Sequence, residues 1–155
     1  MLRRGLTAAG LVIAAVVLVA GGRAEPAQSH AAHTCSALDK QFIKAAGLSS
    51  AAVEVLGQDY VAGDVEPADA IAQAKDAALG LEVTKPRDRS LELVRVLMRG
   101  MITEYGKAIR AQWKGRDDAG EHMYRSYSFA NYAHQVLVQA QAPLEAKGCS
   151  LADLL

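Results

Sequence analysis

Side chains able to bind a metal or haem are concentrated in one stretch, His122-Met-Tyr-Arg-Ser-Tyr-Ser-Phe-Ala-Asn-Tyr-Ala-His-Gln135. The stretch holds four of the eight aromatic residues in the chain, two of the four histidines, and a methionine. Neutral imidazole is a common metal ligand, and histidine and methionine side chains ligate haem iron. The question is whether these side chains converge on one point or divide between a hydrophobic core and a surface.

A helical reading divides the stretch. Successive residues are 100° apart around a helix, so side chains three and four positions apart share a face. Met123, Tyr127 and His134 then lie on one apolar stripe together with Ala130 and Leu137, while the opposite face carries Tyr124, Asn131 and Tyr132. The stripe predicts that His134 lies in a core, hydrogen-bonded to a tyrosine or a carbonyl oxygen. The alternative is a ligand site formed by His134, Met123 and Tyr127.

A helical bundle with histidine and methionine inside resembles the b-type cytochrome bundle. That resemblance implies a haem whose iron is held by one methionine and one histidine, here His134 with Met101 or Met123 nearby. The methionine of that family lies near the start of the first helix, where this sequence has none, and no C-x-x-C-H motif is present for covalent haem attachment. Cys149-Ser-Leu151 is also similar to the ends of small exported hemophore-like proteins, over three residues only.

A second metal-like cluster, His30-Ala-Ala-His33-Thr-Cys35, precedes the helical part of the chain. An exposed pair of imidazoles at this spacing could bind copper or zinc. The stretch 25–34 is small, polar and without periodicity, so the alternative is a solvated flexible linker in which His30 and His33 bind nothing.

Basic residues form a stripe on the third predicted helix: Arg95, Arg99, Lys107, Arg110 and Lys114. Such a stripe could dock on an anionic partner, an anionic lipid or an envelope polymer. The alternative is a solvated face that pairs with acidic residues between Asp64 and Glu82.

Catalytic motifs are absent from the sequence. Ser126 and Ser128 lie near His122, but without a Gly-x-Ser-x-Gly context, and neither a phosphate-binding glycine loop nor H-E-x-x-H occurs. Glu104 is expected to be exposed. We therefore expect a protein that is not an enzyme and has no obligatory cofactor, with an enzyme of unrecognised type as the third possibility after a haem- or metal-binding bundle.

The elements that would position these residues are all helical. The first helix is predicted over residues 36–62, the second from Pro67 to about Glu82, the third from the 84–88 capping segment to about Gln112, and the fourth from about Asp118 to 142 or beyond. Pro143 should end or kink the last helix. Gly100 and Gly106 predict a close neighbouring helix or a bend.

The amino terminus predicts export. Residues 1–24 combine a short basic segment, a long uncharged segment and a small-residue cleavage site ending at Ala24, which is the layout of a signal peptide. An uncleaved membrane anchor is the alternative, since the uncharged run approaches the roughly 20 residues of a spanning helix. Cleavage removes Arg3, Arg4 and Arg23, so 17 basic residues become 14 against 17 acidic ones. A mildly acidic exported protein is a poor candidate for nucleic-acid binding.

The two cysteines, Cys35 and Cys149, lie near the ends of the remaining chain and predict one disulfide in an oxidising compartment. Four helices with short connections predict an antiparallel up-down-up-down four-helix bundle over residues 35–155. In that topology the first helix begins where the fourth ends, which brings the cysteines together. The sequence thus predicts a secreted, periplasmic or cell-envelope bundle that binds another envelope or extracellular component and, once cleaved, is not inserted in the membrane.

Overall fold

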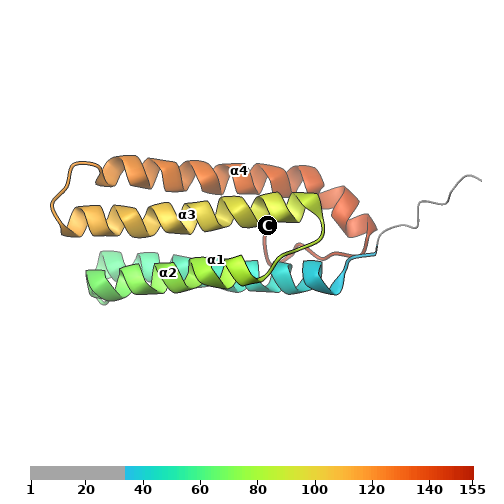
Figure 1. Ribbon diagram of the computed structural model, residues 1–155, viewed down its shortest axis with the longest axis horizontal. Coiled ribbons are helices and arrows are strands. Elements are labelled where there is room, and N and C mark those ends of the chain that lie inside the picture. Colours follow the sequence, from blue (N-terminus) through green and yellow to red (C-terminus); the bar gives the residue numbers. More distant parts are fainter. Residues whose placement is uncertain (1–33) are drawn as a thin grey trace, which may run out of the picture. The chain divides into compact units, whose positions relative to one another are not determined.

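The computed structural model describes residues 34–155, which contain four α-helices and no strand (Figure 1). They are α1 (Ala37–Ala62), α2 (Pro67–Val83), α3 (Arg89–Trp113) and α4 (Ala119–Ala146). The all-α prediction is confirmed. The predicted signal peptide and the tail residues His30 and His33 lie outside the described residues. No helix of the described part combines the length and hydrophobicity needed to cross a bilayer.

Local sequence signals set the ends of the helices. Ser36 caps α1 in a capping box with Asp39, and Gly63 ends that helix in the left-handed conformation at φ 81°. Pro67 occupies the first turn of α2, where its missing amide hydrogen costs no helical bond. The side chain of Asp88 accepts a hydrogen bond from the Ser90 amide at the start of α3 (2.8 Å).

Pro143 lies inside α4, which continues to Ala146. Figure 1 shows the last part of α4 turning away from the direction of the rest of the helix. Proline removes one backbone hydrogen bond and its ring crowds the preceding turn, so a helix that continues past proline bends there.

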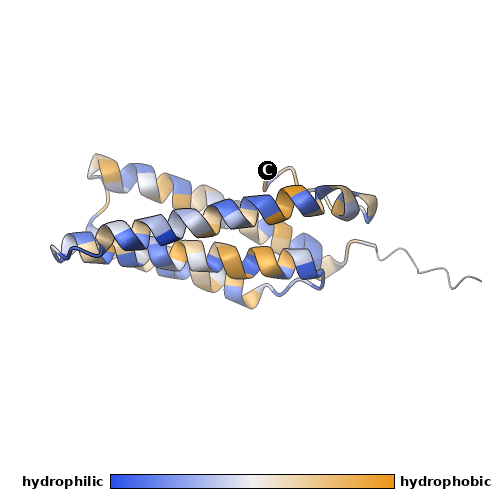
Figure 2. Cartoon of the chain, turned by 90° about the horizontal axis from the view of Figure 1, so that it is seen from above, coloured by the Kyte–Doolittle hydropathy of each residue, from blue (hydrophilic) through white to orange (hydrophobic). Residues whose placement is uncertain are grey.

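α3 is the central helix, because it packs against each of the other three. α1 also packs on α2, whereas the backbone of α4 approaches no described helix other than α3. Large side chains that are fully buried come from all four helices and the carboxyl-terminal tail: Phe42, Leu81, Leu91, Ile102, Ile109, Leu144 and Leu151. Figure 2 shows hydrophobic and hydrophilic positions interleaved along the helices, as expected where each helix buries only part of its circumference.

Glycines on α3 allow close approach on two sides. A Cβ atom on Gly100 would lie 3.2 Å from the ring of Phe129 in α4, and one on Gly106 would lie 3.4 Å from the Cβ atom of Ala74 in α2. The sequence left close packing and bending open at these positions. The structure shows close packing at both.

The two ends of the described chain meet at one point. The Sγ atoms of Cys35 and Cys149 are 2.05 Å apart, the distance of a disulfide bond, and their Cα atoms are 5.1 Å apart. The Cys35 amide donates to the Lys147 carbonyl oxygen (2.7 Å), and the Lys147 ammonium group contacts Asp88 (2.7 Å). This pairing is compatible with an extracellular or periplasmic location, where disulfides persist.

Candidate functional site

In the stretch from His122 to Gln135, the residues of the predicted apolar stripe do not all lie in the core. Met123 and Tyr127 are 45% and 67% exposed, and His134 is exposed as well. The buried positions of α4 are instead Ser126, Ala133, Leu137, Ala140 and Leu144. The predicted core position of His134 is therefore wrong.

The physical reason is the number of neighbours of α4. In an up-down-up-down four-helix bundle each helix has two neighbours, and a wide stripe of the fourth helix would be buried. In the structure the backbone of α4 closely approaches only α3 among the described helices. Ser50 and Tyr60 of α1 line hollows beside His134 and Met123, but no second helix packs closely enough to bury that side of the stripe. No described residue makes a hydrogen bond to the His134 ring.

The candidate haem ligands separate into different surroundings. His134 lines a hollow of about 170 Å³ together with Met98 and Met101. Met123 lines another hollow, near Tyr60 and Tyr105. Pockets that enclose ligands of drug size have volumes of roughly 300–1,000 Å³, so the His134 hollow does not enclose a porphyrin. Among the described residues, no three or more His, Cys, Asp and Glu side chains are grouped as a metal site.

The basic residues of the predicted stripe on α3 do not form one surface. Arg95 is buried, and its guanidinium donates to both carboxylate oxygens of Glu92 (2.8 and 2.6 Å). These hydrogen bonds raise the pKa of Arg95, and they outweigh burial, which lowers it. The pKa therefore lies above its ordinary value. The assignment of Arg95 to an exposed anion-docking surface is therefore wrong: its charge is already matched inside the protein.

Three other members of the stripe surround one groove between α2 and α3. Arg99, Lys107 and Arg110 line it from α3, and α2 adds Lys75, which the sequence reading did not select. Lys75 could have been found from the α2 pattern, because it lies four residues after Ile71 and four before Leu79 and so shares their face of the helix. Lys114 does not line the groove.

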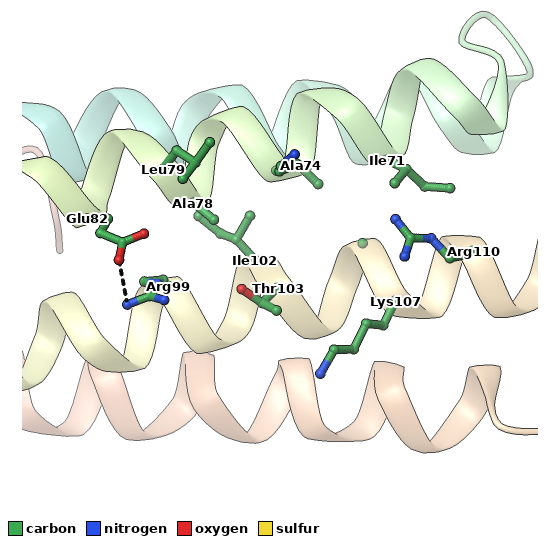
Figure 3. Close-up of a pocket in the computed structure, with 12 residues that line it drawn as sticks. Ile71, Ala74, Ala78, Leu79, Glu82, Arg99, Ile102, Thr103, Lys107 and Arg110 are labelled. Atoms are coloured by element: carbon green, nitrogen blue, oxygen red, sulfur yellow. Dashed lines mark ion pairs between the residues drawn. The ribbon is translucent and has the colours of Figure 1, made fainter.

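The groove combines an apolar floor with a positively charged rim. Its floor is formed by Ala74, Ala78 and Ile102, all buried, and its volume is about 260 Å³. Figure 3 shows the floor residues between two polar ends, with the Glu82–Arg99 ion pair at one end and Arg110 beside Ile71 at the other. The small side chains of Ala74 and Ala78 leave this space between the two helices.

The charges of the rim are only partly compensated. Arg99 lies 3.5 Å from Glu82, and the Lys107 ammonium group lies 2.6 Å from Glu104. Lys75 and Arg110 have no ion-pair partner among the described residues. Glu82 is the single acidic residue in the lining. A guanidinium and an ammonium group beside an apolar floor can bind a carboxylate or phosphate whose organic part is apolar.

A polar cluster joins α3 to α4 next to this groove. Glu104 is 8% exposed and contacts the Lys107 ammonium group (2.6 Å) and Nδ1 of His122 (2.7 Å). Burial alone would raise the pKa of Glu104, but Lys107 and His122 together hold it below its ordinary value. The expected exposure of Glu104 is wrong. The carboxylate is buried because Lys107 and His122 supply its polar contacts. The apolar pattern of the sequence showed no sign of these partners.

A carboxylate beside a histidine could orient a catalytic base, but the nearest candidate nucleophile is engaged elsewhere. The Ser126 hydroxyl donates to the Met101 carbonyl oxygen (2.9 Å). Nε2 of His122 lies 3.6 Å from an oxygen of Asp118, a second carboxylate. Ser128 donates to the Tyr124 carbonyl oxygen (2.9 Å). The described geometry therefore ties α3 to α4 without presenting an activated hydroxyl.

Comparisons with protein-family models, with curated proteins and with solved structures found nothing that matches this chain.

Proposed function

We propose that this chain is an exported, non-enzymatic binding protein whose α2–α3 groove holds a single-chain anionic amphiphile from the cell envelope or its surroundings. The observation that carries the proposal is the pairing of uncompensated cations, Lys75 and Arg110, with the apolar floor of one groove. The cations would receive a carboxylate, and the hydrocarbon chain would cover Ala74, Ala78 and Ile102.

Two properties of the groove favour an amphiphile over a simple anion. A simple anion would use the rim but leave the apolar floor in contact with water. Burying one methylene group is worth about 0.8 kcal/mol, or up to about fourfold in affinity. The floor therefore adds affinity only if the ligand has an apolar chain that reaches it.

The test is equilibrium binding of a series of fatty acids, from acetate to long-chain homologues. Affinity should increase with chain length, and Arg110→Gln combined with Lys75→Gln should reduce it by about tenfold or more, since each lost charge-assisted hydrogen bond is worth about 1.5–3 kcal/mol. Lys114→Gln is the control, because it removes a positive charge at the carboxyl-terminal cap of α3, outside the groove. Equal affinity of the double variant and the wild type would refute the proposal.

The export proposal rests on residues 1–24 together with the disulfide pairing of Cys35 and Cys149. We infer cleavage after Ala24, so the exported protein should begin at Glu25. Sequencing the amino terminus of the secreted protein tests this. A protein retained in the membrane fraction with Met1 intact would instead support the anchored alternative.

We also infer the antiparallel up-down-up-down arrangement of the helices. Contacts between the starts of α1 and α3 support it, since Asp39 accepts from the amides of Arg87 and Asp88 (2.7 and 2.9 Å). Contacts between their ends agree, since the Tyr60 hydroxyl lies 3.4 Å from the Gln112 side chain. α1 and α3 then run the same way, and the short connections make α2 and α4 run oppositely. Nuclear Overhauser contacts between Tyr60 and Gln112 would check the register.

A further inference from the structure

Residues with soft donor atoms line a hollow that α3 shares with α4 and with Ser50 of α1. Met98 and Met101 of α3 and His134 of α4 line it, together with Leu154 of the carboxyl-terminal tail. Its volume of about 170 Å³ is smaller than the roughly 300–1,000 Å³ of pockets that enclose organic ligands. The lining contains no carboxylate.

The helices bring these three side chains to one place for separate reasons. Met98 and Met101 are three residues apart, so they share a face of α3. The small side chains of Ala130 and Ala133 line the same hollow, one turn before and directly beside His134. Met98 is 5% exposed, whereas His134 is exposed and makes no hydrogen bond with a described residue. The hollow therefore has a buried thioether inside and an accessible imidazole at its mouth.

We propose that Met98, Met101 and His134 bind a soft monovalent metal ion, copper(I), through two thioether sulfurs and one neutral imidazole nitrogen. Thioether ligands select copper(I) over hard cations, and imidazole suits copper as well. The three ligands are uncharged and the hollow is apolar, so no negative charge would offset the cost of removing a bound ion from water. That cost is larger for a divalent ion, so the site favours a singly charged one. This proposal does not depend on the anion groove, which lies between α2 and α3.

The cysteines make silver(I) a clean probe for this site. Silver(I) is a redox-stable analogue of copper(I) that needs no reductant, so the Cys35–Cys149 pair stays intact. Both cysteines of the chain belong to that pair, so no thiol competes for the probe. The tail histidines could compete, and the full chain should therefore carry His30→Gln and His33→Gln as the background.

In chloride-free buffer, silver(I) titration of this background should show one bound ion per chain. The methyl resonances of Met98 and Met101 should shift in the ¹³C-methionine NMR spectrum, and that of Met123 should not. Met101→Leu and His134→Gln should each weaken binding by about tenfold or more, at least as much as the loss of an outer-shell partner of a metal ligand. Met123→Leu is the matched control, because Met123 lies in a different hollow.

The outcomes separate clearly. Unchanged Met98 and Met101 resonances at saturating silver(I) would overturn the site. So would binding that disappears from the His30→Gln, His33→Gln background, because the tail would then hold the ion. Zinc(II) binding as tightly as silver(I) to the same residues would overturn the assignment to a soft ion. Circular dichroism of each variant without metal would show whether a loss of binding reflects a loss of folding.

Discussion

Asp39 connects the start of α1 to the segment that precedes α3. It is 5% exposed, and its carboxylate accepts hydrogen bonds from the amides of Ser36, Arg87 and Asp88 and from the Ser36 hydroxyl. Burial alone would raise the pKa of Asp39, but these hydrogen bonds lower it below its ordinary value. The ionised carboxylate is therefore the form that stabilises the fold.

The predicted effect of Asp39 on stability depends on pH. Because its pKa is lower in the folded state than in the unfolded state, its contribution is fully present above the unfolded value of about 3.9 and is lost as the pH falls through the folded value. Asp39→Asn should lower the free energy of unfolding by about 1–3 kcal/mol at neutral pH, where an amide nitrogen replaces an acceptor.

Urea unfolding of the wild type and Asp39→Asn at neutral and acidic pH measures this. The difference between the two proteins should shrink at acidic pH. Asp153→Asn is the control, since Asp153 is an exposed aspartate. A difference between wild type and Asp39→Asn that stays constant with pH would contradict the role of the ionised form.

At the scale of the elements, α3 organises the protein, and its Gly100 lies at the close contact with α4. Gly100 faces the Phe129 ring at a distance that excludes a larger side chain, whereas a Cβ atom on Gly80 of α2 would meet nothing within 4 Å. The two glycines thus have the same helix propensity and different surroundings. They form a matched pair for testing how closely α3 and α4 must pack.

Gly80→Leu should raise the free energy of unfolding by about 0.5–1 kcal/mol, because leucine has the better helix propensity. Gly100→Leu should lower it by about 1–3 kcal/mol, since the added side chain would push α4 away from α3. Denaturant unfolding compares the two variants. If Gly100→Leu were as stable as Gly80→Leu, α3 and α4 would not be in the close contact seen here.

At the scale of the whole molecule, the Cys35–Cys149 pair encloses nearly all of the helical chain, with a sequence separation of 114 residues. Closing so long a loop restricts the unfolded chain, which in the chain-entropy model is worth roughly 4–5 kcal/mol. Replacing both cysteines by serine should therefore lower the free energy of unfolding by about 2–5 kcal/mol. Thermal and urea unfolding of the double variant, against reduced and oxidised wild type, measures this.

Reduced wild type should behave like the double serine variant. A double variant as stable as the oxidised protein would show that the hydrogen bonds around Cys35, Lys147 and Asp88 hold the ends together without the disulfide.

The sequence by itself determined the helical content and the helix boundaries at Ser36, Gly63 and Pro67, because caps, glycine and proline act on nearby backbone. It also determined the pairing of Cys35 with Cys149, because the chain has two cysteines. It also selected three of the four cations around the α2–α3 groove. Only the tertiary structure decided that His134 is exposed, that Arg95 and Glu104 are buried, and that Met98 joins His134 at one hollow. Those outcomes depend on which helices are neighbours and how closely they pack, and the backbone of α4 closely approaches only α3 among the described helices. Periodicity shows that a helix has an apolar face, but the number of partners decides how much of that face is buried.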